Sequence, residues 1–320
     1  MGNEPTFSII LPTYNGVDFV GDALESIQGQ TFEDYELVVS DDASSDDTCA
    51  VVENHPVSPE IFLKNEENVG IGRNTNRAVS RARGKYIAFL DQDDRWLPNK
   101  LATHAETHDR ESAVMAYSDY RVVSNDGSSI DTWRCPDSNS SGTSLLKQLI
   151  EEHNFVRTLS GVTLSRDLWN RLGGFDGTFQ LAADYDFWFR LAESHDFEHI
   201  PELLIEKRVH DQNVSANRGL NYRELLYLLH KLSLRHPELR EDIRRKRRET
   251  HFTRAWGAYL NENSHAAAKY SVRCLHDHDD ILHDELGIKP YGLLGLSVLD
   301  LVSGPMALGR KILEVKRVVS

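Results

Sequence analysis

Cysteine is scarce in this chain of 320 residues, and none of it is paired at short spacing. The three cysteines, Cys49, Cys135 and Cys274, are odd in number and far apart, which argues against a disulfide framework and against a cysteine-rich zinc site. The N-terminus also lacks a basic segment followed by a long apolar one, so we expect no secretory signal. Both features predict a cytoplasmic protein.

Basic residues are in the minority. Lysine and arginine together number 36, against 50 aspartates and glutamates, and the formal net charge is −14. A surface of this sign repels the phosphates of DNA and RNA, so we expect no nucleic acid among the partners. A smaller ligand that carries phosphate must then be bound locally, by a metal ion or by arginine.

Long hydrophobic runs are also missing, apart from residues 291–309. That run contains Asp300 near its middle, and a central aspartate costs about 3 kcal/mol on insertion into a membrane. We therefore expect a helix packed on the protein rather than a membrane span. Residues 310–319 contain four basic side chains and one acidic one, which predicts a peripheral contact with the cytoplasmic face of the cell membrane.

Short apolar runs alternate with helical patterns through the first 90 residues. Four strands are expected there, at 7–11, 36–40, 61–63 and 86–90. This alternation is typical of an α/β fold with a mostly parallel sheet flanked by helices. Strand patterns stop near residue 216, so we predict a catalytic domain at 1–216 and a helical C-terminal extension at 217–320.

Carboxylates follow two of the predicted strands directly. Asp41 and Asp42 come after the second strand, and Asp91, Asp93 and Asp94 come after the fourth. Parallel sheets bind ligands beyond the carboxyl ends of their strands, so these acids are expected at one edge of the sheet. Asp-x-Asp on such a loop supplies the oxygen ligands that a divalent cation prefers. The alternative, a helix cap at this loop, needs only one acid.

These motifs resemble those of family 2 glycosyltransferases over residues 5–215. The pieces occur in the family's order: Pro12-Thr13-Tyr14-Asn15, Asp41-Asp42-Ala43-Ser44, Asn68-Val69-Gly70, Arg73, Asp91-Gln92-Asp93-Asp94, and Gly173-Gly174-Phe175-Asp176 before Asp184. The resemblance implies a GT-A type, Rossmann-like fold. It also implies inverting transfer of one sugar from a nucleotide-sugar donor, by family habit a UDP-sugar, to an acceptor.

The resemblance places a nucleotide site at the ends of the first four strands. The residues implied to bind the nucleotide are Pro12, Tyr14, Asn15, Asp41, Asp42, Arg73, Asp91 and Gln92. Asp42 would accept a hydrogen bond from uracil N3–H, Tyr14 can stack on the base, and Arg73 at a helix start favours an anion. Taken singly, the paired acids also fit an Asx-turn, and Tyr14 fits an aromatic packed on the sheet.

The resemblance implies that Asp93 binds a divalent cation, Mn²⁺ or Mg²⁺. Asp91 would contact the ribose or a metal-bound water, and His210, in the family's late Arg-x-His segment, could complete the metal shell. A diphosphate leaving group gains negative charge as the sugar bond breaks, and such a cation stabilises that charge. The alternative for His210 is a structural histidine.

Asp184 occupies the position of the family's general base, which takes the proton of the acceptor hydroxyl. Ala183 stands where the family usually has glutamate, which weakens any assignment of an acceptor contact there. Asp184 also fits a helix N-cap, and the two roles are compatible.

Processive synthesis is not expected. Gln92-x-x-Arg95-Trp96 matches the Gln-x-x-Arg-Trp signature of processive synthases, but it overlaps the metal loop, so we interpret it as coincidence. The basic tail favours an acceptor linked to polyprenyl or dolichyl phosphate. Two other functions stay open: a catalytically inactive binding module, and a nucleotidyltransferase, which would usually have a basic phosphate loop after the first strand.

Overall fold

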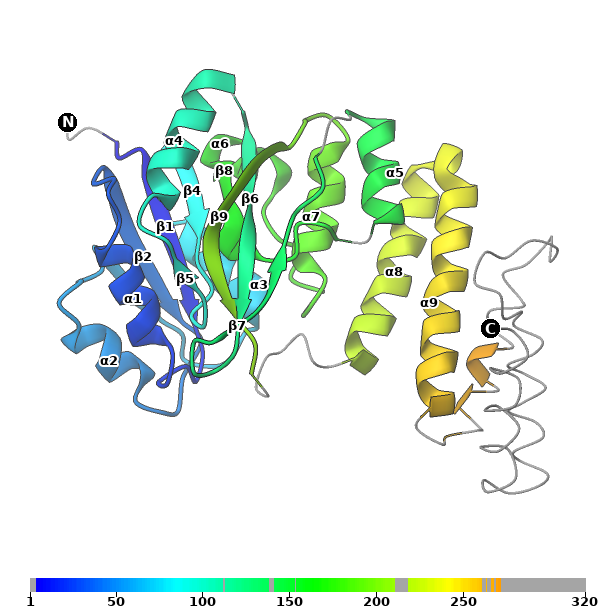
Figure 1. Cartoon of the computed structure of the whole chain (residues 1–320), viewed down its shortest axis with the longest axis horizontal. Helices are drawn as coiled ribbons and strands as arrows, with labels where there is room; N and C mark the ends of the chain where they lie inside the picture. The colour runs from blue at the N-terminus through cyan, green and yellow to red at the C-terminus, as the bar shows by residue number, and fades with distance from the viewer. Residues whose placement is uncertain are drawn as a thin grey trace. The chain divides into compact units, whose positions relative to one another are not determined.

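The computed structural model describes residues 4–111, 113–137, 141–152, 154–210 and 218–260, together with 263, 266, 267 and 269–271 (Figure 1). The chain divides into two compact units, Met1–Asn217 and Arg218–Ser320. The first unit contains every residue predicted for the nucleotide, the metal and the base. Each unit is described by itself below.

The first four strands of the first unit are parallel. They are β1 (Phe7–Thr13), β2 (Tyr35–Asp41), β3 (Ile61–Lys64) and β4 (Tyr86–Phe89), in the spatial order β3-β2-β1-β4. Ile9 on β1 pairs with Leu37 on β2 and with Ala88 on β4, and all three side chains are buried. The apolar runs that predicted these strands are therefore buried between covering layers, as expected for a parallel sheet.

Helices connect these strands and bury one face each. They are α1 (Val20–Gln28), α2 (Thr48–Asn54) and α3 (Ile71–Val79). Helix α3 packs on β1 and β2, while α1 and α2 pack on each other. Asp46 and Asp47 lie immediately before α2. Asp47 is the N-cap residue but makes no side-chain capping bond, and Asp46 accepts a hydrogen bond from the Thr48 N–H at 3.0 Å instead.

The second half of the sheet mixes directions. Its elements are β5 (Arg95–Trp96), α4 (Lys100–Glu111), β6 (Met115–Val123), β7 (Ser129–Trp133), α5 (Thr143–Glu151), η1 (Leu159–Gly161), β8 (Val162–Ser165), α6 (Arg166–Leu172), α7 (Ala183–Ala192) and β9 (Glu198–Arg208). The sheet continues as β4-β8-β6-β9-β5, and β7 pairs with β6. β6 and β9 are parallel, and the other new pairs are antiparallel. The α/β class is confirmed, and the parallel pairs lie mostly among β1 to β4.

One antiparallel pair in this half, β6 with β7, follows from a short connection. The β6–β7 hairpin turns at Asn125-Asp126-Gly127, where Gly127 has φ of 81°. That left-handed conformation favours glycine, and the turn was expected from the sequence. The hairpin brings Trp133 at the end of β7 beside Tyr120 on β6, with ring centroids 6.4 Å apart.

The second unit is helical where the structure describes it. Helix α8 (Arg218–Arg235) leads through the short turn η3 (Pro237–Leu239) to α9 (Arg240–Leu260), and the two helices pack together. Their contact buries Leu228, Leu229 and Ile243. No helix within the described ranges is long and apolar enough to cross a membrane. The apolar run 291–309 and the basic residues 310–319 lie outside the described residues.

Candidate active site

Asp41 and Asp42, at the end of β2, are buried and hydrogen-bonded inside the fold. Asp41 accepts from the Thr13 hydroxyl at 2.8 Å and from the N–H and hydroxyl of Ser44 at 2.8 and 2.6 Å. Asp42 accepts from the Asn65 amide at 2.7 Å and from the N–H groups of Val69 and Gly70, both at 2.9 Å. A carboxylate offers about four acceptor positions, so Asp42 keeps one for a ligand donor.

The loops after β1 and β2 each contain a residue with an unusual backbone conformation, and hydrogen bonds connect the two loops. Asn15 has φ of 45°, and its side-chain oxygen accepts from the Ser45 N–H at 2.8 Å. Ala43 has φ of 63°, a left-handed conformation that an L-residue adopts at some cost. Pro12 is buried at the end of β1, whereas Tyr14 is 44% exposed and therefore available to stack on a base.

Gln92 connects the loop after β4 to the loop after β1. Its side-chain oxygen accepts from the Tyr14 N–H, and its amide donates to the Tyr14 carbonyl, both at 2.9 Å. A Cβ on Gly16 would collide with this amide group, so Gly16 leaves room for the Gln92 side chain in this position. The sequence predicted that Gln92 binds the nucleotide. In the structure its amide positions Tyr14, which was itself predicted to bind the base.

Asp93 meets His210 at the end of β9. The His210 Nε2 lies 3.0 Å from an Asp93 carboxylate oxygen, and the imidazole stacks on Phe19 with ring centroids 4.3 Å apart. These residues are 117 positions apart in the sequence, so the predicted pairing of loop and late segment depends on the fold. Arg208, from the same segment, pairs with Asp22 at 2.5 Å and is therefore engaged within the protein.

Asp91, Asp93, Asp94 and Asp184 form an acidic cluster. Burial, followed by the charges of Asp94, Asp93 and Asp184, raises the pKa of the Asp91 carboxyl. Burial and the charge of Asp93 likewise raise the pKa of Asp94. Within the described ranges, no three His, Cys, Asp or Glu side chains are already arranged to hold a metal ion.

Ser160 was missed by the sequence reasoning, although it organises this loop. Its hydroxyl accepts from the Asp91 N–H at 3.0 Å and donates to the Asp94 carboxylate at 2.6 Å. Its carbonyl accepts from the Trp96 indole at 2.8 Å, and Trp96 is buried. Trp96 is therefore part of the core. No local pattern marked Ser160, because its partners are more than 60 residues away in sequence.

Asp184 lies in the first turn of α7 and is half-buried. Its carboxylate accepts from the Asn154 amide at 2.9 Å and from the Tyr185 N–H at 2.7 Å. Burial raises the pKa of Asp184 to about 6, and these hydrogen bonds together with the charge of Lys207 oppose the rise. The N-cap residue of α7 is Ala182, so Asp184 does not have the N-cap role considered for it.

Lys207 on β9 is a second residue that the sequence analysis did not single out. Its charge lowers the pKa of Asp91, Asp94 and Asp184, and its Nζ donates to the Arg157 carbonyl at 2.8 Å. Lys207 is next to Arg208 in the sequence, and this position in the late segment was the only sequence feature that could have indicated its role.

Arg73, at the third position of α3, is exposed and has no ion-pair partner among the described residues.

Comparison with known proteins identifies the family. The model of glycosyl transferase family 2 matches residues 8–172, just over half of the chain. The chain belongs to this family. A glycosyltransferase of Rickettsia typhi whose function is uncharacterised is 29% identical over 226 residues, which are 69% of each chain.

Solved structures of glycosyltransferases share the fold. Staphylococcus aureus TarS 1–349 in complex with UDP-GlcNAc aligns with a TM-score of 0.66 at 18% identity, over 85% of this chain and 81% of that chain. The mannosyltransferase PcManGT from Pyrobaculum calidifontis, in complex with GDP-Man and Mn²⁺, aligns with a TM-score of 0.58 at 17% identity, over 95% and 82%. The chain is a glycosyltransferase of the GT-A type, and the nucleotidyltransferase alternative is not supported.

Proposed function

We propose that this enzyme transfers one sugar, with inversion, from a UDP-sugar to an acceptor hydroxyl with the help of a divalent cation. The observation that carries the proposal is the convergence of Asp93, His210 and Asp184 at the ends of β4, β9 and the start of α7. The exposed Tyr14 and the remaining acceptor position of Asp42 fit a uracil base. The neighbour TarS, which binds UDP-GlcNAc, supports a UDP donor, and PcManGT, which binds GDP-Man, makes GDP the alternative to test.

The residues at this edge fit a divalent cation. Asp93 and His210 are 3.0 Å apart, and together they supply an oxygen and a nitrogen ligand. Catalytic Mg²⁺ and Mn²⁺ sites commonly take one or two protein ligands and complete their shell with substrate phosphates and water. Two protein ligands are therefore sufficient, which agrees with the lack of a three-residue site within the described ranges. When bound, such a cation stabilises the charge on the departing diphosphate.

The proton transfer is proposed for Asp184. With a pKa of about 6, its carboxyl is ionised at neutral pH and still basic enough to accept a proton from the acceptor hydroxyl. Asn154 holds one carboxylate oxygen, which fixes the direction of the group. The acceptor oxygen bonds to the anomeric carbon as the bond to the diphosphate breaks, and the hydroxyl proton goes to Asp184. Arg73, exposed and unpaired among the described residues, is proposed to contact a donor phosphate.

The acceptor is proposed to be a lipid-linked glycan at the cytoplasmic face of the membrane. The support is the composition of residues 310–319, which are basic in an otherwise acidic chain. Vesicles with 30% phosphatidylserine should pull down the full chain at low salt, and the chain without residues 310–319 should stay in the supernatant. Equal sedimentation of the two proteins would contradict the membrane contact and leave the transferase proposal intact.

Calorimetric titration of UDP, GDP and dTDP, with and without Mn²⁺, tests the donor site. We expect binding of UDP that depends on Mn²⁺ and is lost in Asp93→Ala and weakened in His210→Ala. The matched control is Asp109→Ala in α4, an acid outside the site, which should bind UDP normally. Absence of binding for all three nucleotides in folded protein would contradict the proposal and favour an inactive binding module.

A further inference from the structure

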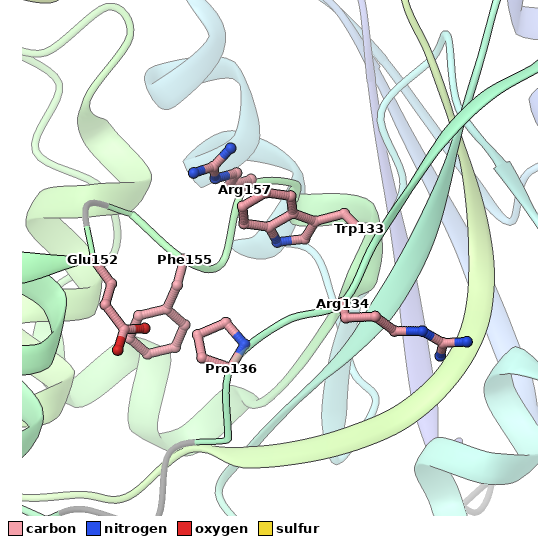
Figure 2. A pocket seen from close by; sticks show the side chains of 6 residues that line it. All are labelled: Trp133, Arg134, Pro136, Glu152, Phe155 and Arg157. Carbon is pink, nitrogen blue, oxygen red and sulfur yellow. The ribbon is translucent and has the colours of Figure 1, made fainter. Parts of the chain in front are cut away.

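A pocket of about 300 Å³ is formed by residues that the proposed donor site does not use (Figure 2). It is lined by Trp133, Arg134, Pro136, Glu152, Phe155 and Arg157. Its volume is at the lower end of the range for small-molecule sites, which suits a single sugar unit rather than a nucleotide sugar. Three of its residues present apolar surface and three are charged, a combination that matches the apolar faces and polar edges of a sugar ring.

Contacts along one loop join this pocket to Asp184. The loop after α5 contributes Glu152, Phe155 and Arg157 to the pocket wall, while Asn154 from the same loop donates to the Asp184 carboxylate at 2.9 Å. Lys207, whose charge lowers the pKa of Asp184, donates to the carbonyl of Arg157 at 2.8 Å. One loop therefore connects the pocket wall to the residue that is proposed to deprotonate the acceptor.

Arg157 has no anionic partner among the residues that the structure describes. Its guanidinium stacks on the ring of Trp133, 3.6 Å from the centroid, and no carboxylate of the described residues pairs with it. Arg134 differs, because it is bound to Asp119 at 2.7 Å, and Figure 2 shows its guanidinium directed away from the other labelled side chains. An exposed arginine held flat against tryptophan keeps its hydrogen-bonding edge free for a carboxylate or a phosphate. This arrangement is notable in a chain with a net charge of −14.

Glu152 brings a negative charge to the pocket, opposite to that of Arg157. In Figure 2 its carboxylate lies near Phe155 and Pro136, on the other side of the pocket from Arg157. A carboxylate accepts hydrogen bonds from sugar hydroxyls and repels acids. A ligand with a single acidic group should therefore bind in one orientation, with the acid toward Arg157 and the hydroxyls toward Glu152.

We propose that this pocket binds one sugar unit of the acceptor, and that Arg157 selects a unit with an anionic substituent. The proposal rests on the transferase function proposed above, because it assigns the acceptor side of that reaction. The anion can be a carboxylate, as in a hexuronic acid, or a phosphate ester, since arginine recognises both in the same two-pronged geometry.

Binding of simple sugars to the full chain tests the pocket. The probes are methyl β-D-glucopyranosiduronate, glucose 6-phosphate and the neutral methyl β-D-glucopyranoside, each titrated to millimolar concentration and followed by saturation-transfer NMR. We expect at least one acidic sugar to bind about tenfold more tightly than the neutral one, equivalent to about 1.4 kcal/mol. The acid that is preferred identifies carboxylate or phosphate as the source.

Variants then test whether Arg157 causes the preference for an acidic sugar. Arg157→Gln should remove the preference for acid while UDP binding stays normal. Arg171→Gln on α6, an exposed arginine paired with Asp167, is the matched control and should keep the preference. Equal binding of acidic and neutral sugars by the wild-type protein, no sugar binding at all, or an unchanged preference in Arg157→Gln would overturn the proposal. If UDP still binds normally in those cases, only the pocket proposal is wrong. If UDP binding is also absent, the proposed transferase function is wrong as well.

Discussion

The two carboxylate groups at the sheet edge differ in how the protein treats their charge. Asp41 and Asp42 after β2 each accept three hydrogen bonds within the fold. Asp91, Asp94 and Asp184 have raised pKa values, and burial is the first cause for all three. The hydrogen bonds to Asp41 and Asp42 come from the loops that they join, whereas the charge of Asp91 is opposed by the neighbouring charges of Asp93, Asp94 and Asp184.

This difference separates structural from reactive acids. Charges that the fold stabilises hold the donor loops in one conformation before any ligand arrives. Charges that the fold destabilises reduce the stability of the empty protein, and this is a common property of catalytic sites. Substitutions in the two groups should therefore change stability in opposite directions, and the predictions below test this.

The largest effect is expected for Asp184→Asn. Loss of the base should lower kcat by about 10²–10⁴-fold, while UDP binding is kept. The pKa of Asp184 is raised, so its ionisation stabilises the unfolded state more than the folded state above pH 6. The neutral variant should therefore be more stable at pH 7, by about 1–2 kcal/mol in urea unfolding.

Asp167→Asn, at an exposed acid on α6, is the control and should leave both activity and stability near wild type. Lower stability in Asp184→Asn would contradict the assignment of Asp184 to the destabilised group.

Asp42→Ala should lower the free energy of unfolding, opposite to the effect expected for Asp184→Asn. It removes the acceptor for the Val69 and Gly70 N–H groups and for the Asn65 amide, all in or around the loop before α3. Buried donors without a partner cost about 1–3 kcal/mol each, and relaxation of the loop recovers part of this, so we expect a loss of about 3 kcal/mol in the free energy of unfolding. Asp47→Ala, where the side chain makes no capping bond, should cost far less. Similar urea midpoints for the two variants would show that the loop does not depend on Asp42.

Asn154→Ala should shift the pH dependence of sugar transfer. The Asn154 amide stabilises the ionised carboxylate of Asp184 and so lowers its pKa. Wild-type kcat should fall as the pH drops through about 6, and loss of the amide should move this limb to higher pH by about 1–2 units, since one hydrogen bond to a charged group is worth about 1.5–3 kcal/mol. Asn170→Ala on α6, an exposed position, should leave the profile unchanged. An unshifted limb would mean that another group controls it.

The sequence predicted the strand ends well and the long-range contacts poorly. The four parallel strands and the acids behind them follow from local patterns, because buried parallel strands are short continuous apolar runs. Ser160 and Lys207 gave no such signal. Their roles depend on partners brought near by the mixed half of the sheet, where β8 and β9 insert beside strands from earlier in the chain.

Individual side chains also escaped prediction for a physical reason. Gln92 was predicted to bind the nucleotide from its place in the motif, and the structure uses its amide to hold the Tyr14 backbone. A sequence motif gives the place of a residue along the chain, whereas the hydrogen bonds of its side chain depend on which loop is next to it in the folded protein. The roles assigned to Asp93, His210 and Asp184 remain predictions, and the structure supplies the distances that make them testable.

The smallest effect concerns the conformation of the donor loop itself. Ala43 has φ of 63°, where a Cβ atom is crowded and glycine is not. Ala43→Gly should relieve about 1–2 kcal/mol of backbone strain and lose about 0.5–1 kcal/mol to the greater entropy of the unfolded chain, a net gain of about 0.5 kcal/mol. Ala105→Gly in the interior of α4 is the matched control and should be destabilised by about 1 kcal/mol. The opposite signs of these two identical substitutions, measured by urea unfolding, would show that the fold imposes the left-handed turn that positions Asp41 and Asp42.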